Sequence, residues 1–324
     1  MFVLDGTSIR QGAGDKKDGK TKIMPKISFI IASVDRDRQL EECISSIEKA
    51  HEYNQDIPIE ILVIIQKAEQ KKDIRIRYPE IIRFHYIDRI GLSTARNFAI
   101  GKSAGEYLVF LDDDAGIKED FINVLSEKIA IYNNAGAFCG KLIDPVRNIP
   151  FSTLFADGKN KKLERFDYQY FMGSAHILTR RVIEKVGCYD ERFGVGARYR
   201  GSEETDMFFR LKAAGEQIVY LPDLVFFHPV LFPPPKYIRN YSYAVGAMLT
   251  KNCIYDKTHF FTYWCIVFGM AVKASVRIFQ KLLLKGVYKE KDERYHYSSV
   301  LKGLLFGVKD YLAENAMMKG NVSQ

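Results

Sequence analysis

Short apolar runs rich in β-forming residues alternate with helical patterns along the first part of this sequence. The runs cover residues 26–33 (KISFIIAS), 59–65 (IEILVII), 81–87 and 106–111 (EYLVFL). Between the first two, residues 38–50 place apolar side chains three, four and seven positions apart, on one face of a helix. Residues 94–103 also have a helical pattern, with Ser93 as the predicted N-cap. Strands that alternate with helices predict an α/β fold with a Rossmann-like, mostly parallel central sheet and helices on both of its faces.

Patterns in the rest of the chain predict further helices and a domain boundary. We expect helices over residues 121–132, 182–186 and 203–214, and a loop or hairpin region over residues 145–170. Consecutive prolines at 233–235 cannot continue a helix or a central strand, so they mark the end of the α/β domain. The predicted organisation is a flexible tail rich in Gly, Lys and Asp (residues 1–24), an α/β domain (25–235) and a helical, basic C-terminal region (236–324).

The C-terminal region combines apolar and basic residues. Residues 260–324 hold ten Lys and Arg against five Asp and Glu, in a chain whose net charge is +8. The apolar stretch 260–272 has 13 residues, fewer than the roughly 20 that a membrane-spanning helix needs. Basic residues then recur at every fourth position, at Lys273, Arg277, Lys281 and Lys285. This pattern is typical of a helix in the interface of an anionic membrane, and it also fits a helix packed on the domain with a solvated cationic face.

Cysteine usage and the N-terminal sequence bear on the cellular compartment. The five cysteines are scattered and form no CxxC pair: Cys43, Cys139, Cys188, Cys253 and Cys265. This spacing argues against a disulfide framework and against a structural zinc site. The N-terminus lacks the charged segment and following apolar segment of a secretory signal. We therefore expect a cytoplasmic protein, held peripherally on the cytoplasmic face of the membrane by its basic C-terminal region.

Three adjacent carboxylates, Asp112, Asp113 and Asp114, directly follow the run at 106–111. In a parallel sheet, ligands bind beyond the carboxyl ends of the strands, and residues 33–36 lie at another such end. Adjacent carboxylates repel one another unless a cation neutralises them, and Mg²⁺ or Mn²⁺ prefers oxygen ligands that it often shares with substrate phosphates. The triplet therefore indicates a divalent-metal site, although a solvated acidic turn has the same sequence.

A second acidic group and a histidine are further candidates. Glu203, Glu204 and Asp206 lie in the first turn of a predicted helix, where the helix dipole favours carboxylates, so a structural role is sufficient to explain them. His228 ends the strand-like run LVFFHP. A lone histidine is more often structural than a ligand, and this one gains weight only together with the Asp triplet.

Taken together, these segments resemble glycosyltransferase family 2, whose members adopt the GT-A fold. The landmarks occur in the family's order: FIIASVDR, GLSTARNFAI, EYLVFLDDD, VIEKVGCYDERF, GSEETDMFFRL and YLPDLVFFHP. The resemblance covers residues 26 to about 230. It implies that the predicted α/β domain is a GT-A glycosyltransferase domain that binds a nucleotide-sugar donor.

The resemblance assigns roles to the Asp triplet and to the histidine. Asp112 and Asp114 match the two DxD positions. This match implies that Asp112, with Asp113 beside it, contacts the donor, and that Asp114 binds the metal. His228 matches a family histidine that helps to hold the metal or the diphosphate.

The resemblance also suggests a catalytic base and a nucleotide pocket. Glu204 falls where the family carries its base, which takes the proton from the acceptor hydroxyl, and Glu203 is the less favoured neighbour. The family usually has Asp at this position, and Glu reaches further. Five residues match segments that line the nucleotide pocket: Ser33, Asp35, Arg36, Arg96 and Asn97. The family's base-reading Asp is replaced by Gln66, whose amide can still hydrogen-bond to a base.

We therefore predict a glycosyltransferase that depends on Mn²⁺ or Mg²⁺ and moves a sugar from a nucleotide-sugar to a glycan or lipid-linked glycan. Inversion by single displacement is expected because no residue stands out as a covalent nucleophile. Family tendency and the basic region point to surface polysaccharide or lipopolysaccharide synthesis. Two alternatives stay open: a nucleotidyltransferase, whose usual glycine-rich loop is missing from IIASVDRDR, and a non-catalytic glycan-binding protein of the same fold. Nucleic acid is not an expected partner because no binding motif accompanies the basic tail.

Overall fold

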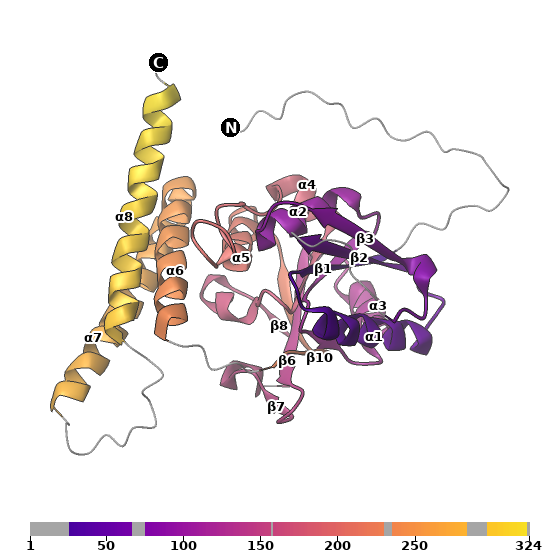
Figure 1. Ribbon diagram of the computed structural model, residues 1–324. Coiled ribbons are helices and arrows are strands. Elements are labelled where there is room, and N and C mark those ends of the chain that lie inside the picture. Colours follow the sequence, from indigo (N-terminus) through magenta and orange to yellow (C-terminus); the bar gives the residue numbers. More distant parts are fainter. Residues whose placement is uncertain (1–25, 67–74, 157, 230–234, 284–296, 323–324) are drawn as a thin grey trace.

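The computed structural model describes residues 26–66, 75–156, 158–229, 235–283 and 297–322. The predicted flexible tail, residues 1–24, lies outside the described residues. Figure 1 shows a sheet with helices around it, and beside them a group of long helices from the C-terminal part of the chain.

One half of the central sheet is parallel, as the sequence predicts. Its strands are β3 (Ile82–Ile87), β2 (Ile59–Gln66), β1 (Ile27–Ser33) and β4 (Tyr107–Asp112), in that spatial order. All neighbours among these four strands run parallel. Every residue of β1 and β2 is buried, which explains why both read as continuous apolar runs and not as alternating patterns.

The other half of the sheet is mixed. The order continues with β9 (His176–Thr179), β6 (Ala137–Asp144), β10 (Ile218–Phe227) and β5 (Gly116–Ile117), while the short β7 (Ile149–Pro150) pairs with β6 and β8 (Lys161–Lys162) with β10. β9 runs antiparallel to both β4 and β6. The sequence analysis missed β6, which is interrupted by Gly140 and Lys141, and β9, which has four residues. The region 145–170 contains β7, β8 and the 3₁₀ turns η2 (Thr153–Ala156) and η3 (Arg165–Tyr170), in agreement with the predicted loop or hairpin.

Five helices accompany the described sheet. They are α1 (Asp37–Tyr53), α2 (Leu92–Lys102), α3 (Phe121–Ile131), α4 (Arg180–Val186) and α5 (Glu203–Ala213), and a 3₁₀ turn η1 (Pro79–Ile81) precedes β3. In Figure 1, α1 and α3 lie together on one side of the sheet, and α2 and α4 lie on the other. The predicted N-cap of α2 is wrong, because the helix begins two residues earlier, at Leu92, with Gly91 as its N-cap. The Ser93 hydroxyl instead donates to the carbonyl of Phe193, 100 residues further along the chain.

The C-terminal region is helical, as predicted, and its helices are α6 (Pro235–Tyr255), α7 (Phe260–Leu283) and α8 (Tyr297–Val322), with a 3₁₀ turn η4 (Lys257–His259) before α7. α6 and α8 lie side by side in Figure 1. Two glycines allow this approach: a Cβ atom on Gly307 would lie 2.1 Å from the carbonyl oxygen of Tyr243, and one on Gly246 would lie 2.5 Å from that of Leu304. α6 starts beside the predicted boundary at residue 235, and the division into domains stays a prediction.

The apolar helix of the C-terminal region is longer than the run of 13 residues that the sequence analysis compared with a membrane span. α7 has 24 residues, and the span Lys257–Val276, which covers η4 and most of α7, contains 18 residues with a mean hydropathy of 1.2, of which 17% are buried. By length and composition alone, this helix could cross a membrane. Of the predicted basic stripe, Lys273 is exposed, while the side chains of Arg277 and Lys281 and the whole of Lys285 lie outside what the structure describes.

We expect Gly307→Ala to destabilise the protein, because its Cβ has no room against the α6 backbone. Overpacking of this kind costs roughly 1–3 kcal/mol. Gly269→Ala in α7 is the matched control: a Cβ there meets nothing within 4 Å, so it should be neutral or stabilise by up to about 1 kcal/mol. Urea denaturation of both variants checks this, and equal stabilities would contradict the close packing of α6 and α8.

Candidate active site

The carboxyl ends of three strands bring the predicted site residues to one edge of the sheet. Ser33 ends β1, Asp112 ends the adjacent β4, and His228 directly follows β10. Asp113 and Asp114 continue from β4 into a turn in which the Ala115 amide donates to the Asp112 carbonyl. The edge predicted from strand order is therefore where the acidic triplet and the histidine meet.

Asp112, Asp114 and His228 form a cluster that could hold a metal ion. One ligand atom from each lies within 4.8 Å of the other two. Nε2 of His228 is 3.3 Å from Oδ1 of Asp114 and 3.7 Å from Oδ2 of Asp112. Two carboxylates and one imidazole suit Mn²⁺ or Mg²⁺, and all three side chains keep some exposure through which an ion and a phosphate could enter. Asp112 thus joins the two residues that the sequence assigned to the metal.

The environment of His228 prepares Nε2 for this role. Its Nδ1 lies 2.9 Å from the carbonyl oxygen of Pro229, so Nδ1 carries the proton and donates it there. Burial lowers the pKa of His228, but the hydrogen bond to Asp114 and the charges of Asp112 and Asp114 outweigh burial and leave its pKa above the ordinary value. The hydrogen bond from His228 is also the main reason that the pKa of Asp114 is lowered. A proton on Nε2 therefore competes with a metal ion for the same three side chains.

Asp113 points away from the cluster. Its carboxylate accepts hydrogen bonds from the Ser33 hydroxyl at 2.8 Å and from the Arg36 guanidinium at 3.1 Å. Arg36 also donates to Asp114 at 2.9 Å. Burial raises the pKa of Asp113 despite these two donors. Ser33, Arg36 and Asp113 therefore fix the turn that presents the metal cluster.

A cleft of about 480 Å³ opens at the cluster. Its lining residues are Ala32, Val34, Arg36, Gln66, Ile90, Gly91, Leu92, Asp112, Asp113, Asp114, Val195 and His228. Gln66 is buried, and its side-chain oxygen accepts from the Gly91 amide at 2.7 Å. Asp35 is exposed, takes a positive φ of 49° and is not among the lining residues. A larger hollow of about 1140 Å³ beside α1 contains none of the cluster residues.

Arg96 connects this cleft to the second acidic group. Its side chain is 1% exposed, and it donates to Asp112 at 3.2 Å, to Glu203 at 3.0 Å and to the carbonyl oxygen of Gly173 at 2.8 Å. Asn97 is likewise engaged with protein groups, since its amide group both donates to the carbonyl of Tyr189 and accepts from the Tyr189 amide. The structure thus gives Arg96 and Asn97 roles in holding other residues, and neither lines the 480 Å³ cleft.

The two adjacent glutamates at the start of α5 differ in their surroundings. Glu203 is buried and paired with Arg96, whereas Glu204 is half-buried and accepts a 3.3 Å hydrogen bond from Thr205. Burial, with the Glu203 carboxylate beside it, raises the pKa of Glu204 to about 8. A carboxyl group whose pKa lies near neutrality can accept a proton from a substrate and release it again.

A second cleft, of about 780 Å³, contains both glutamates and shares Leu92, Asp112 and Val195 with the first. The segment 194–202 forms one side of it, and Asn240 and Tyr241 of α6 contribute as well. The sequence analysis missed these last two residues. The segment has positive φ at Gly194, Gly196, Arg200 and Ser202, and its glycines were the signal that could have marked it as part of the site.

The chain was compared with known proteins. Residues 28–187 match the model of the family described as glycosyl transferase family 2. An uncharacterized protein of Haemophilus influenzae is 27% identical over 177 residues, which is 50% of this chain and 91% of that protein. Glycosyltransferase GlyA of Streptococcus pneumoniae is 31% identical over 117 residues, or 33% of this chain, and the match spans 15% of the length of GlyA.

Solved structures share the fold over most of this chain. S. aureus TarS 1-349 superposes with a TM-score of 0.58 at 13% identity, covering 87% of this chain and 81% of that one. The mannosyltransferase PcManGT from Pyrobaculum calidifontis, solved in complex with GDP-Man and Mn²⁺, has a TM-score of 0.56 at 14% identity, covering 90% and 88%. At these identities the likeness establishes the fold and nothing finer.

We expect the protein to bind Mn²⁺ and Asp114→Asn to weaken this binding by about 10²-fold or more, because even second-shell changes at metal sites cost 10–100-fold. Asp113→Asn is the matched control. Its loss of Mn²⁺ affinity should be at most a tenth as large, because the Asp113 carboxylate faces Ser33 and Arg36. Affinity should fall as the pH falls through the titration range of His228, which lies above its ordinary value of 6.5. Calorimetric titration checks both points; equal losses in the two variants would contradict the assigned cluster.

Proposed function

We propose, starting from a chain whose residues 28–187 belong to glycosyltransferase family 2, that this protein transfers a sugar from a nucleotide-sugar to an acceptor hydroxyl with inversion at the anomeric carbon. The family and the GT-A fold predicted from the sequence are confirmed, and they favour glycosyl transfer over the nucleotidyltransferase alternative. The donor class has support from relatives of the same fold, TarS and PcManGT, which were solved with UDP-GlcNAc and GDP-Man.

The observation that carries this proposal is the pair of clefts that meet at Asp112. One cleft contains the carboxylate and histidine cluster, and the other contains Glu204. A donor diphosphate in the first cleft would direct its sugar toward the shared wall, and an acceptor hydroxyl in the second would approach the sugar from the side of Glu204. This arrangement suits a single displacement, in which nucleophile and leaving group lie on opposite sides of the reacting carbon.

A divalent ion, Mn²⁺ or Mg²⁺, would be held by Asp112, Asp114 and His228, and when bound it neutralises the charge that develops on the departing diphosphate. Arg36 lies at the same cleft and adds a fixed positive charge there. Gln66 also lines this cleft, and we assign it to the nucleotide base. These residues bind and orient the donor.

Glu204 is the proposed general base. Because Arg96 neutralises Glu203, Glu204 is the member of the pair that has no cation in hydrogen-bond contact among the described residues. It would accept the proton of the acceptor hydroxyl as that oxygen attacks the anomeric carbon. A retaining reaction would instead need a nucleophile at the sugar. Asp112, which both clefts share, and Glu203, which lines the second cleft, are both paired with Arg96.

Glu204→Gln should leave donor affinity unchanged and lower transfer by about 10²-fold or more, since the amide keeps the shape but cannot accept a proton. In the wild type, kcat/KM should fall tenfold per pH unit below about 8, because protonation of Glu204 removes the base, and it should level off above that pH. Glu203→Gln is the matched control and should keep more activity, with the pH profile moved to lower pH. Greater damage from Glu203→Gln would reverse the assignment within the pair.

Membrane attachment is proposed from the two faces of α7. Tyr263 and Ile266 face the protein and are buried, while Phe261 and Phe268, about half a turn away around the helix, are 78% and 69% exposed. A helix that is apolar all round needs an apolar environment on both sides. Further exposed apolar side chains continue this surface along α7 and α8: Trp264, Val272, Val276, Phe279, Leu305 and Phe306.

We propose that this surface lies in the headgroup region of an anionic membrane, on the cytoplasmic face of that membrane. Lys273 lies beside the exposed aromatic side chains of α7. The acceptor would then be a glycan or lipid-linked glycan presented at that membrane, as in the synthesis of surface polysaccharide or lipopolysaccharide. Family membership, the exposed aromatic face and the basic C-terminal region support this placement together.

The protein should sediment with anionic liposomes at low salt and be largely released at high salt, since each cation contributes about 1 kcal/mol that salt screens. Replacing Lys273, Arg277, Lys281 and Lys285 by Gln should reduce binding to anionic vesicles, and Phe261→Ser with Phe268→Ser should reduce binding to anionic and neutral vesicles alike. Transfer to a short soluble acceptor should survive both changes. Binding to neither kind of vesicle would contradict the attachment, and extraction from cell membranes by detergent alone would indicate that α7 spans the bilayer.

A further inference from the structure

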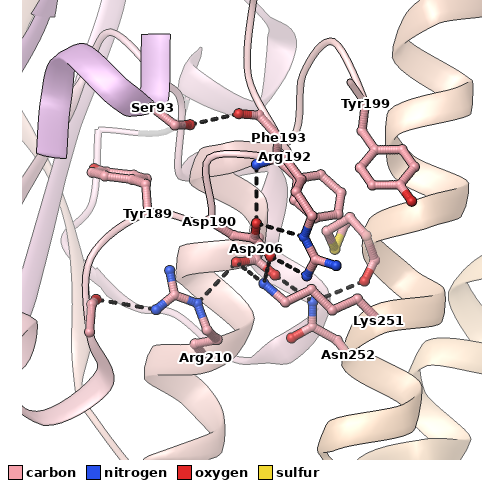
Figure 2. Close-up of polar contacts among 12 residues, drawn as sticks. Ser93, Tyr189, Asp190, Arg192, Phe193, Tyr199, Asp206, Arg210, Lys251 and Asn252 are labelled. Carbon is pink, nitrogen blue, oxygen red and sulfur yellow. Dashed lines mark hydrogen bonds and ion pairs between the residues drawn. The ribbon is translucent and has the colours of Figure 1, made fainter. Parts of the chain in front are cut away.

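One lysine of the C-terminal helices joins a buried carboxylate, Asp206, to a partly buried one, Asp190, next to the second cleft (Figure 2). Asp190 starts the segment 190–202, part of which lines the second cleft. Asp206 lies in α5, two residues after Glu204. Nζ of Lys251, on α6, lies 2.8 Å from Oδ2 of each carboxylate. The side chain of Asp206 is fully buried and that of Lys251 is 11% exposed. Charges this deep must be paired to be tolerated.

The other cations at this pair of carboxylates are local to them. Arg192 holds Asp190 two residues away with hydrogen bonds of 3.0 and 2.7 Å, and Arg210 holds Asp206 four residues away at 2.9 Å. Arg210 also donates to the backbone carbonyls of Val186, Gly187 and Cys188, just before Asp190. Among the described residues, Lys251 is the cation that touches both carboxylates, and through them it ties the segment 190–202 and α5 to α6.

The neighbouring residue strengthens the link. The Asn252 side chain donates to Oδ1 of Asp206 at 3.0 Å and to the carbonyl of Met248 at 3.0 Å, which fixes Asp206 against α6 (Figure 2). Burial raises the pKa of Asp206, but Lys251 and Arg210 outweigh burial and keep its pKa below the ordinary value. The Asp206 carboxylate is therefore ionised, and its negative charge attracts Lys251.

The segment 190–202 is also held by α8, through Glu314. Glu314 accepts hydrogen bonds from the Tyr199 hydroxyl and from Arg198, and it lies 3.7 Å from Arg192. Between these attachments, the Phe193 carbonyl accepts from Ser93 (Figure 2), and the Val195 carbonyl accepts from the Leu92 amide. The segment 190–202, part of which lines the second cleft, is thus attached to α2 and to the C-terminal helices.

We propose that Lys251 is a positioning residue: it fixes the start of α5 and the segment 190–202 relative to each other, and so aims Glu204 into the second cleft. The C-terminal helices, which carry the exposed apolar face, are by this inference also part of the acceptor side of the active site. Asn240 and Tyr241 of the same helix line that cleft directly. The inference rests on the proposed function of Glu204 as base.

Two readouts test the position of Lys251. Amide hydrogen exchange across residues 190–206 reports the geometry whether or not the protein transfers a sugar, and kinetics report its consequence. The variants are Lys251→Met, which keeps the length but not the charge, Lys251→Arg, which keeps the charge, and Lys257→Met as a control at an exposed lysine of the same region.

Lys251→Met should speed exchange in 190–206 by at least about tenfold, lower kcat by about tenfold or more, and leave donor affinity within about twofold, because the donor cleft does not depend on this lysine. Lys251→Arg should restore part of kcat, and Lys257→Met should match the wild type. Unchanged exchange in folded Lys251→Met overturns the inference, as does a loss of donor affinity equal to the loss of kcat. If the wild type transfers no sugar, the proposed function fails while the exchange result still decides the role of Lys251.

A second variant covers the case in which Lys251→Met does not fold. Adding Asp190→Asn removes one of the two carboxylates that the missing ammonium would leave repelling each other. The double variant should fold, and its kcat should exceed that of Lys251→Met by at least about threefold if the single variant can be measured. A double variant that unfolds as readily as the single one, or that is no more active, shows that Lys251 does not act by neutralising this pair.

Discussion

The structure depends on one buried guanidinium. Arg96 is 1% exposed and pairs with Asp112 at the end of β4 and with Glu203 at the start of α5. A charge in such a position is stable only while its partners stay in place, and removing one partner of a buried pair costs roughly 3–5 kcal/mol. The free energy of folding is therefore tied to the distance between the end of β4, with its carboxylate cluster, and the start of α5. Under the proposed function, the same contact sets the donor side and the acceptor side relative to each other.

The same guanidinium explains how two adjacent glutamates take different roles. Glu203 is paired with Arg96, whereas burial, and after it the neighbouring Glu203 carboxylate, raises the pKa of Glu204 to about 8. Under the proposed function, these two identical and adjacent side chains serve as a structural anion and as a proton acceptor. Their environments, and not their identities, separate them.

The C-terminal helices join the exposed apolar face of α7 to the segments around the second cleft. α6 packs closely on α8 through Gly246 and Gly307, and it reaches the catalytic segments through Lys251 and Asn252. α7 carries the exposed aromatic face on the side opposite its buried residues. In the proposed membrane attachment, a rigid connection of this kind would keep the second cleft at a fixed distance from the membrane surface. A fixed distance matters because the proposed acceptor is itself attached to lipid.

Much of the fold and part of the site could be predicted from the sequence, because their signals are local. Buried parallel strands read as apolar runs, and the Asp triplet stands directly after one of them, so periodicity and strand order predicted β1, β2, β4 and the edge of the sheet that carries the triplet. The short or interrupted strands β6 and β9 gave no such signal.

What only the tertiary structure decided are the contacts between residues far apart in the chain. The sequence placed Arg96 at the nucleotide, whereas the fold turns it toward Glu203, 107 residues later. Likewise nothing local distinguishes Lys251 from the other lysines of the basic region, because its role comes from two carboxylates 45 or more residues away. Periodicity reports which side of an element faces the core. Which charges meet inside that core depends on how the elements pack, and the cost of burying each charge then selects its partner.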